Sequence, residues 1–383
     1  MADTLPIKRR VPLSRLTSLR LGGDAEYLVS ASSAKLAVEA LDFAAKRQMP
    51  VTILGGGSNV VIADEGIAGL VIVMRQRGRS ERQTGAQLFV NVAAGESWDE
   101  LVRWSVQRGL GGIECLAGIP GTVGAAPVQN IGAYGQELSS VVDSVIAYDR
   151  STHTSVKLDA AACGFAYRSS CFKAQPDRYL ILRVNLMLQR DAAPTLAYAE
   201  LAREVAERVG AAPTLAQVRR VVLELRGNKG MLLGDQGQGF KSVGSFFTNP
   251  VVTRANALAV EQAARAAGVL APQETMPRWP VADGRCKLSA GWLIERAGLA
   301  RGLTQGRVGI SPKHALSLIH HGGGDTRSLI QLARHVQYRV ARRFDIWLEA
   351  EPCMLGFPSP PLAPPAEGYA SGVGSGSASL PSP

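Results

Sequence analysis

The segment from Gly118 to Glu137 reads G-I-P-G-T-V-G-A-A-P-V-Q-N-I-G-A-Y-G-Q-E, and it decides how the rest of the chain is interpreted. It holds five glycines, three alanines and two prolines and carries almost no charge. Backbone with so few side chains lets a ligand or another chain segment come close. Successive N–H groups in glycine-containing turns form concave anion sites. The segment is therefore either a cradle for a phosphate-bearing ligand or a tightly packed turn between two strands.

A second glycine-rich turn, L-G-G-G-S-N, lies upstream at Leu54–Asn59. It contains G-x-G, but the third glycine of a dinucleotide fingerprint would fall at Val60, and no G-K-[ST] follows. The sequence thus excludes a Rossmann motif and a P-loop. What remains is a turn that presents N–H groups and the side chains of Ser58 and Asn59 to a diphosphate, or a plain hairpin-like turn.

Size and composition indicate a folded protein of two or three domains: 383 residues, 46% hydrophobic and 19% charged. No run of about 18 apolar residues predicts a membrane span, and no apolar segment near the N-terminus predicts a secretory signal. The five cysteines are scattered and never in C-x-x-C spacing, which argues against a disulfide framework or a zinc site. We expect a cytoplasmic protein that binds no metal and does not enter the membrane.

The formal charge of +10 makes nucleic acid a candidate partner. Basic residues concentrate at Lys8–Arg10 and Arg75–Arg82, but no aromatic residues are interleaved and no helix-turn-helix or RNA-recognition signature is present. A small anionic ligand would use the same positive potential. We therefore expect no nucleic-acid partner and interpret Arg75–Arg82 as a solvated face.

Helix-start signals divide the chain into elements. Ser97-x-x-Glu100 and Thr214-x-x-Gln217 have the spacing of capping boxes. Thr326 is the predicted cap of a last long helix, which we expect to end near residue 343 and to be followed by a strand over 344–348.

Three polar residues stand in apolar surroundings. Arg168 lies in a largely hydrophobic stretch, Ser245 precedes two phenylalanines, and Glu351 closes the predicted strand. A surface salt bridge, a turn hydroxyl and a solvated terminus would explain them one at a time. Local sequence alone leaves catalytic and structural roles open.

Five ordered segments together resemble one known family. They are L-G-G-G-S-N, I-P-G-T-V-G-A-A-P-V-Q-N-I-G-A-Y-G, Y-R-x-S-x-F-K, G-S-F-F-x-N-P and K-L-S-A-G-W-L-I-E-R-A-G. On these motifs the chain, from about Leu16 to Gly356, resembles the UDP-N-acetylenolpyruvoylglucosamine reductases, the flavoenzymes that complete UDP-N-acetylmuramate in bacterial peptidoglycan synthesis. Q-N-I-G-A-Y-G, together with L-A-Y-A-E-L around Tyr198, looks like the larger, type I branch.

The resemblance implies an α+β fold: a two-lobed FAD-binding domain of the vanillyl-alcohol-oxidase (PCMH) type plus a C-terminal α/β substrate-binding domain. The implied parts are a flexible lead-in at 1–13, FAD-binding subdomains at 14–75 and 76–227 (the second completed by 344–356), a substrate domain at 228–343 and a disordered tail at 357–383. FAD would be held non-covalently with its phosphates against both glycine turns. We expect a monomer.

The resemblance also implies the chemistry. FAD would carry hydride from NADPH to C3 of the enolpyruvyl group, and a proton would reach C2. Charge then develops on the substrate carboxylate, and Arg168 suits that charge because a guanidinium meets a carboxylate in a two-point fork. Glu351 could share this task if it is protonated, and Ser245 matches the family's proton donor.

Binding residues carry over from the same resemblance. Those implied for the cofactor are Gly55, Gly56, Gly57, Ser58, Asn59, Pro120, Gly121, Thr122, Gly124, Ala125 and Arg226. Those implied for the substrate are Tyr134, Tyr167, Tyr198, Lys229, Asn249 and His314.

Several positions depart from the family pattern. Ser169 and Cys171 stand where Asp and Ile are commonest, Thr248 where many members have Lys, and His314 where Gln is frequent. The ending L-E-A-E-P differs from the usual L-E-P-E-V, which leaves Glu349 as an alternative to Glu351 for the catalytic acid.

Two other functions remain open. A related flavin oxidase of another alcohol or sugar would consume oxygen, and its flavin would not be oxidised faster by the enolpyruvyl substrate. A basic nucleic-acid-binding protein on the same scaffold would be colourless and would bind DNA with a steep salt dependence.

Overall fold

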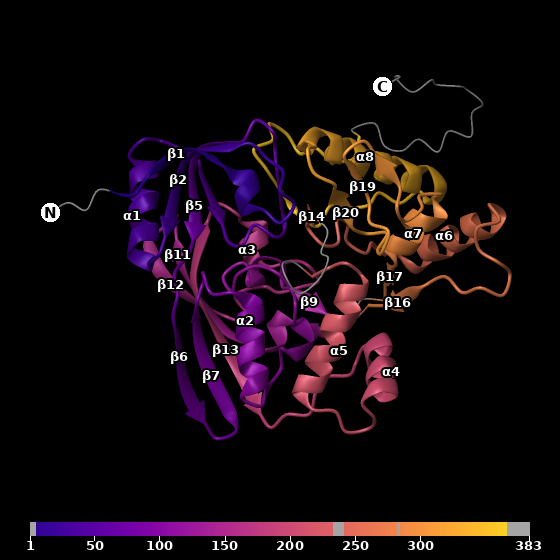
Figure 1. The fold of residues 1–383 in the computed structure, drawn as a ribbon, viewed down its shortest axis with the longest axis horizontal. Helices are drawn as coiled ribbons and strands as arrows, with labels where there is room; N and C mark the ends of the chain where they lie inside the picture. The colour runs from indigo at the N-terminus through magenta and orange to yellow at the C-terminus, as the bar shows by residue number, and fades with distance from the viewer. Residues whose placement is uncertain (1–4, 233–240, 282–283, 366–383) are drawn as a thin grey trace.

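The computed structural model describes residues 5–232, 241–281 and 284–365. Two sheet-containing parts, indigo to pink, occupy the left and lower regions of the view, and a third part, with the orange-to-yellow helices α6 to α8, lies at the upper right (Figure 1). No helix in these ranges is long and apolar enough to cross a membrane. The same ranges contain no group of three or more His, Cys, Asp or Glu residues that could hold a metal ion.

The N-terminal part is a four-stranded sheet in the order β1-β2-β5-β3. Its elements are β1 (Lys8–Pro12), β2 (Asp24–Ala31), α1 (Ala34–Ala45), β3 (Val51–Leu54) and β5 (Ile67–Met74). β5 pairs in parallel with both β2 and β3, and α1 connects β2 to β3, which lie on either side of β5 and run in the same direction. β1 adds an antiparallel edge.

The second part is a six-stranded antiparallel sheet in the order β12-β11-β13-β7-β6, with β8 also paired to β13. Its strands are β6 (Arg79–Thr84), β7 (Gln87–Ala93), β8 (Leu110–Gly111), β11 (Val142–Asp149), β12 (Thr154–Asp159) and β13 (Tyr179–Arg190); its helices are α2 (Trp98–Gln107), α4 (Ala199–Arg208) and α5 (Leu215–Asn228). Val29 and Leu70 of the first sheet and Val90 and Trp98 of the second part belong to one continuous hydrophobic core. The two sheets are therefore lobes of one packed unit.

Short elements connect these helices and strands. They are α3 (Cys171–Ala174), β9 (Gly132–Ala133), β10 (Gln136–Glu137) and the 3-10 helices Leu13–Leu16, Glu114–Leu116, Ala126–Gln129 and Leu138–Ser140. The two predicted capping boxes differ in outcome. Thr214 and Gln217 form both reciprocal bonds, whereas at Ser97 only the bond from the N–H of Glu100 to the Ser97 hydroxyl is present among the described contacts.

The third part packs three helices against two small antiparallel sheets. Its elements are β14 (Lys241–Ser242), β15 (Val251–Val252), α6 (Arg254–Ala266), β16 (Arg278–Pro280), β17 (Cys286–Leu288), α7 (Ala290–Arg296), β18 (Thr304–Gln305), β19 (Val308–Ile310), β20 (Leu318–His320) and α8 (Thr326–Phe344). Phe246, Leu293 and Val336 lie at the centre of its own core.

The chain returns to its N-terminal part after α8. Strand β21 (Cys353–Leu355) pairs in parallel with β4 (Val60–Ile62). The segment 344–356 was expected to complete the second subdomain, but this strand pairs with the first. The sequence does not predict that this strand pairs with β4, because the backbone groups at a strand edge can pair with any extended segment that supplies N–H and C=O groups.

The region around α8 corrects two further expectations. The N-cap is Asp325 and not Thr326, since the Asp325 carboxylate accepts from the N–H of Ser328, while Thr326 donates its hydroxyl proton to the carbonyl of Ile62. The predicted strand over 344–348 is wrong: α8 includes Phe344 and ends at Asp345, whose φ is 54°. Phe344 continues the apolar spacing of the buried face, which keeps it helical.

Part of the predicted disordered tail is packed. Leu362 is 8% exposed, and its carbonyl accepts hydrogen bonds from Gln337 at 3.1 Å and from the indole of Trp347 at 3.2 Å. Together with the Pro361 carbonyl, which accepts a hydrogen bond from Arg334 at 2.7 Å, this contact attaches a proline-rich stretch to α8. Residues 366–383, the rest of the predicted tail, lie outside the described residues.

The basic cluster at 75–82 has partners within the protein. Arg77 forms an ion pair with Glu96 at 3.1 Å, and the guanidinium of Arg79 lies 3.8 Å from the centre of the Trp104 ring. These contacts agree with a solvated, internally paired face.

Candidate active site

A cavity of about 690 Å³ lies where the three parts meet. Both glycine-rich turns line it, as do β21, the end of α5 and the segment around Ser245. All residues predicted to bind the cofactor line this cavity: Gly55, Gly56, Gly57, Ser58, Asn59, Pro120, Gly121, Thr122, Gly124, Ala125 and Arg226.

The two glycine turns touch each other. A Cβ atom on Gly56 would lie 2.6 Å from the Cα of Gly121, so any side chain there would separate them. The Ser58 hydroxyl donates to the Pro120 carbonyl at 3.0 Å, and the Asn59 amide donates to Gln129 at 2.6 Å. The two interpretations of these segments, a packed turn and a ligand cradle, are therefore compatible. The two turns pack against each other, and both also line the cavity.

Two polar atoms in the cavity wall suit an anionic ligand. Thr122 Oγ1 and Arg226 Nε are buried and have no hydrogen-bond partner among the described residues. Burial lowers the pKa of the Arg226 guanidinium, and no acidic side chain in the described ranges forms an ion pair with it. A buried cation beside a hydroxyl and close-packed backbone fits the phosphates of a dinucleotide such as FAD.

Arg168 and Glu351 meet at the wall of the same cavity. Arg168 Nε donates to Glu351 Oε1 at 3.0 Å, and its Nη2 donates to the Gly132 carbonyl at 2.9 Å. Arg168 has a φ of 52°, a left-handed conformation that non-glycine residues adopt at a cost. Burial raises the pKa of the Glu351 carboxyl, and the guanidinium of Arg168 opposes this shift. The pair thus holds a fixed guanidinium next to a carboxyl with an increased tendency to keep its proton.

Backbone pairing between the segment after Ser245 and the segment around Glu351 places Ser245 near this site. Phe247 forms a β-bridge with Ala350, and the N–H of Glu351 donates to the Phe246 carbonyl at 2.9 Å. These bonds bring Ser245, which also lines the cavity, close along the backbone to Glu351. Among the described residues the Ser245 hydroxyl has no hydrogen-bond partner, which leaves it available to a ligand.

The two candidate acids lie in different environments. The backbone carbonyl of Glu349 accepts from Thr248 at 2.9 Å, while Glu349 itself is exposed and does not line the cavity. The Glu351 side chain is only 12% exposed. The geometry favours Glu351 as the acid.

A second cluster contains four of the residues predicted to bind substrate. The rings of Tyr134 and Tyr198 meet edge to face at 5.7 Å, and Lys229 Nζ lies 5.5 Å from the centre of the Tyr134 ring. Lys229 also forms an ion pair with Glu200 at 2.8 Å. Burial, together with the positive charge of Lys229, lowers the pKa of His314 to about 4, so this imidazole is neutral at physiological pH.

Tyr167 and Asn249 form a separate contact. Burial raises the pKa of the Tyr167 hydroxyl, while Arg168 and hydrogen bonding to Asn249 oppose the shift. Asn249 Oδ1 also accepts from the first N–H of α7, at Ala290, at 3.0 Å. The predicted substrate residues therefore lie in two clusters outside the wall of the 690 Å³ cavity.

Sequence reasoning missed two acidic residues near these sites, Asp99 and Glu200. Asp99 accepts from the N–H of Gly118, and Glu200 holds Lys229. Each stands in the first turn of a helix, where an acidic residue is expected for helix stability alone. The local sequence pattern does not distinguish Asp99 and Glu200 from acidic residues that only stabilise a helix start.

Glycine turns that line a cavity with a buried cation, together with a separate C-terminal domain, suit a protein that binds a phosphate-bearing ligand such as a dinucleotide without a Rossmann motif. Comparison with known proteins agrees. Residues 25–153 match the model of an FAD binding domain, and residues 236–355 match the model described as "UDP-N-acetylenolpyruvoylglucosamine reductase, C-terminal domain".

Whole-chain relatives extend this match. The UDP-N-acetylenolpyruvoylglucosamine reductase of Thermobifida fusca is 45% identical over 355 residues, covering 92% of this chain and 99% of the relative. That of Pseudomonas aeruginosa is 42% identical over 315 residues, covering 82% and 88%. The crystal structure of the Thermus caldophilus enzyme superposes with a TM-score of 0.60 at 24% identity, covering 92% of this chain and all of that one, and supports the fold.

The chain belongs to the UDP-N-acetylenolpyruvoylglucosamine reductase family. It is a flavoenzyme that uses FAD and NADPH, so the sequence-based prediction of fold, cofactor and enzyme class is confirmed.

Proposed function

We propose that this protein reduces UDP-N-acetylglucosamine enolpyruvate to UDP-N-acetylmuramate, a peptidoglycan precursor, with Arg168, Glu351 and Ser245 as its catalytic residues. The observation that carries the proposal is the contact between Arg168 and Glu351 at the wall of a cavity lined by both glycine turns and by Ser245. Family membership supplies the reaction, and the geometry supports the roles of the side chains.

The glycine turns, Thr122 and Arg226 would hold FAD non-covalently. When bound there, FAD would supply the redox chemistry by which hydride passes from NADPH to C3 of the enol ether. Arg168 is fixed by Gly132 and Glu351 and points its remaining donors toward charge that develops on the substrate carboxylate. Because burial raises the pKa of Glu351, this carboxyl keeps its proton to higher pH than an ordinary glutamate, and its protonated form can donate a hydrogen bond to the same group.

Ser245 delivers the proton to C2. Its hydroxyl lies in the cavity wall on the segment that pairs with Ala350 and Glu351, and it has no competing partner in the described structure. A serine hydroxyl is a weak acid, so its proton transfer depends on neighbouring donors or a water molecule that replaces the proton.

The tyrosine–lysine cluster is the proposed site for the nucleotide–diphosphate end of the substrate. Lys229 supplies a point charge for the diphosphate, and Tyr134 and Tyr198 supply aromatic surfaces. Neutral His314 would border this site, and Tyr167 and Asn249 would lie between it and the reacting carbons. The type I assignment remains a proposal that rests on the segments Q-N-I-G-A-Y-G and L-A-Y-A-E-L.

The domain limits inferred from sequence remain a proposal, with strand β21 now paired to the first lobe. A monomeric state and a cytoplasmic location also stay predictions. Gel filtration with light scattering tests the first, and cell fractionation tests the second.

The reaction is tested on the purified protein by its visible flavin absorbance and by NADPH oxidation with and without the enolpyruvyl substrate. We expect yellow protein, flavin released on denaturation, and substrate-dependent NADPH oxidation. Protein that cannot bind FAD, or oxygen consumption that the substrate does not alter, would contradict the proposal.

The role of Ser245 is tested by separating the half-reactions. Ser245→Ala should keep flavin reduction by NADPH and lose flavin reoxidation by substrate. Normal rates for both would exclude Ser245 as the proton donor.

A further inference from the structure

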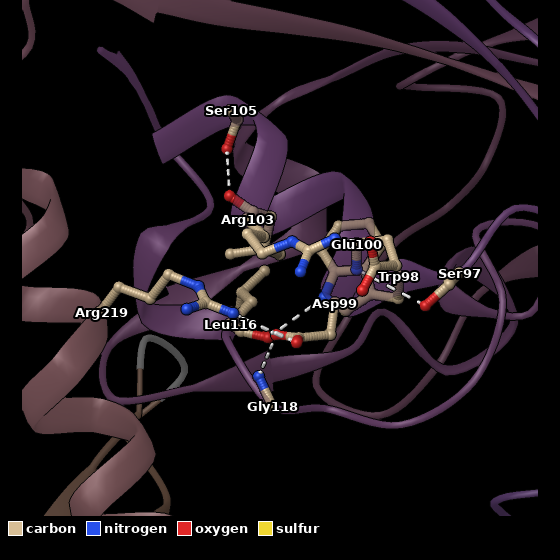
Figure 2. Close-up of polar contacts among 10 residues, drawn as sticks. Ser97, Trp98, Asp99, Glu100, Arg103, Ser105, Leu116, Gly118 and Arg219 are labelled. Atoms are coloured by element: carbon tan, nitrogen blue, oxygen red, sulfur yellow. Dashed lines mark hydrogen bonds and ion pairs between the residues drawn. The ribbon is translucent and has the colours of Figure 1, made fainter. Parts of the chain in front are cut away.

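Asp99, in the first turn of α2, contacts the start of the glycine-rich loop and helix α5 at the same time (Figure 2). Its Oδ1 accepts a hydrogen bond from the N–H of Gly118 at 2.6 Å. Arg219 Nη2 donates to Oδ2 at 3.2 Å and to Oδ1 at 3.3 Å. The side chains of Asp99 and Arg219 are 24% and 15% exposed, so water and salt screen this pair less than a surface pair.

Gly118 lies directly against the end of α5. Its φ is +69°, and a Cβ atom at this position would lie 3.3 Å from Arg226 Nε and 2.6 Å from Leu232 Cδ2. Arg219 and Arg226 stand seven residues apart on α5, about two helical turns, and therefore on the same face. One carboxylate thus fixes the backbone of Gly118 and the helix that carries Arg226 into the cavity.

Neutral contacts fasten the rest of the loop to the same end of α2. The backbone N–H of Trp98 donates to Gly121 at 3.1 Å, and its indole N–H donates to Leu116 at 3.1 Å. Ser97 forms a β-bridge with Thr122. Asp99 adds a charged link that also reaches α5, which none of these contacts does.

We propose that Asp99 is a positioning residue for FAD. It holds the glycine-rich loop and Arg226 in the geometry that FAD needs before FAD arrives, which lowers the ordering cost of binding. This inference rests on the proposed function only in taking FAD as the ligand.

The test is FAD affinity of the flavin-free protein, measured by flavin fluorescence quenching. Asp99→Ala removes both links and should weaken FAD binding about tenfold or more, because neither the loop backbone nor the helix that carries Arg226 is then held in place by a charged group. Asp99→Asn keeps an oxygen for Gly118 and loses the charge, so it should recover part of that loss. Glu100→Gln is the matched control, because Glu100 is the next residue, is 56% exposed, and pairs with Arg103.

A double-mutant cycle separates positioning from general destabilisation. Asp99→Asn and Arg219→Gln should each weaken FAD binding. In the double variant, the loss of binding free energy should be smaller than the sum of the two single losses, because both substitutions break the same ion pair. Thermal unfolding of each flavin-free variant identifies any that fails to fold. If the parent binds FAD and Asp99→Ala binds it equally tightly, or if the two variants act additively, the inference is overturned. If the parent itself does not bind FAD, the proposed function fails instead.

Discussion

Arg168 Nε donates a hydrogen bond to Glu351 Oε1 at 3.0 Å, although 183 residues separate the two in sequence. Their side chains are 19% and 12% exposed. If one member of such a pair is removed, the other is left as an unpaired charge with little access to water. The resulting loss of stability is larger than the net stabilisation that the intact pair provides. The two residues therefore respond to mutation as a unit.

Arg168→Lys tests the two-point role of the guanidinium. A lysine is a point charge and cannot replace the fork that bonds Glu351 and Gly132 together. We expect substrate turnover to fall about 10²- to 10³-fold, the usual loss when a transition-state donor is removed. Rapid-reaction kinetics should locate the loss in flavin reoxidation by substrate. Arg203→Lys, at an exposed site, is the control, and an unchanged turnover of Arg168→Lys would exclude the role.

Glu351→Gln and Glu349→Gln distinguish the two candidate acids. The raised pKa of Glu351 predicts that kcat declines with rising pH as this carboxyl loses its proton. Glu351→Gln should lower kcat and remove that decline, because an amide does not titrate. Glu349→Gln should retain the parent's kcat and its decline with rising pH. A normal pH profile in Glu351→Gln would assign the acid elsewhere.

The same shift affects stability. The folded chain binds the Glu351 proton more tightly than the unfolded chain, so this contribution is fully present below the ordinary value of 4.5 and is lost as pH rises through the higher folded value. Urea unfolding of Glu351→Gln, compared with the parent, should therefore show a relative gain in stability as pH rises above 4.5.

Glu200→Gln tests whether this carboxylate competes with the substrate for Lys229. The two side chains are 31% and 29% exposed and form an ion pair at 2.8 Å, so a diphosphate must share or replace Glu200. We expect the variant to bind UDP about two- to fivefold more tightly, the scale of a partly exposed pair. Calorimetric titration measures this, with Glu207→Gln on the same helix as control. Weaker binding would show that Glu200 orients Lys229 and does not compete for it.

His314→Gln should change acid stability. The folded pKa of His314 is lowered from 6.5 to about 4, so its contribution is present above 6.5 and is lost as pH falls toward 4. The loss is at most about 3.5 kcal/mol, at about 1.4 kcal/mol for each pH unit. Denaturant unfolding between these pH values should show a smaller loss of stability for His314→Gln than for the parent, while exposed His321→Gln matches the parent. Equal losses in all three proteins would contradict the assignment.

The residues that the motifs predict for the cofactor all line one cavity in the structure. Both glycine turns line one cavity because their composition is dictated by close backbone approach, as at Gly56 and Gly121, and such a constraint is visible in sequence. The catalytic roles of Arg168, Ser245 and Glu351 were predicted from the family resemblance, with Glu351 taken from its place in L-E-A-E-P, since each side chain alone has an ordinary structural explanation.

Other features depend on contacts that no local pattern encodes. The partner of β21 is chosen by the strand edge it reaches, and the end of α8 is set by the packing of Phe344 against the third part. Asp99 and Glu200 resemble common acidic residues at helix starts, and their partners Gly118 and Lys229 come from other segments. Tertiary placement decides their roles.

The pairing of β21 with β4 has a consequence for synthesis of the enzyme. A nascent chain that has emerged only as far as α8 already contains the two lobes, both glycine turns and Arg168. It still lacks Glu351 and the strand that covers Val60–Ile62. Under the proposed roles, the candidate site is therefore completed only after the residues that follow α8 have been synthesised, and a premature stop before residue 351 would yield a protein with much of the cavity lining but without Glu351.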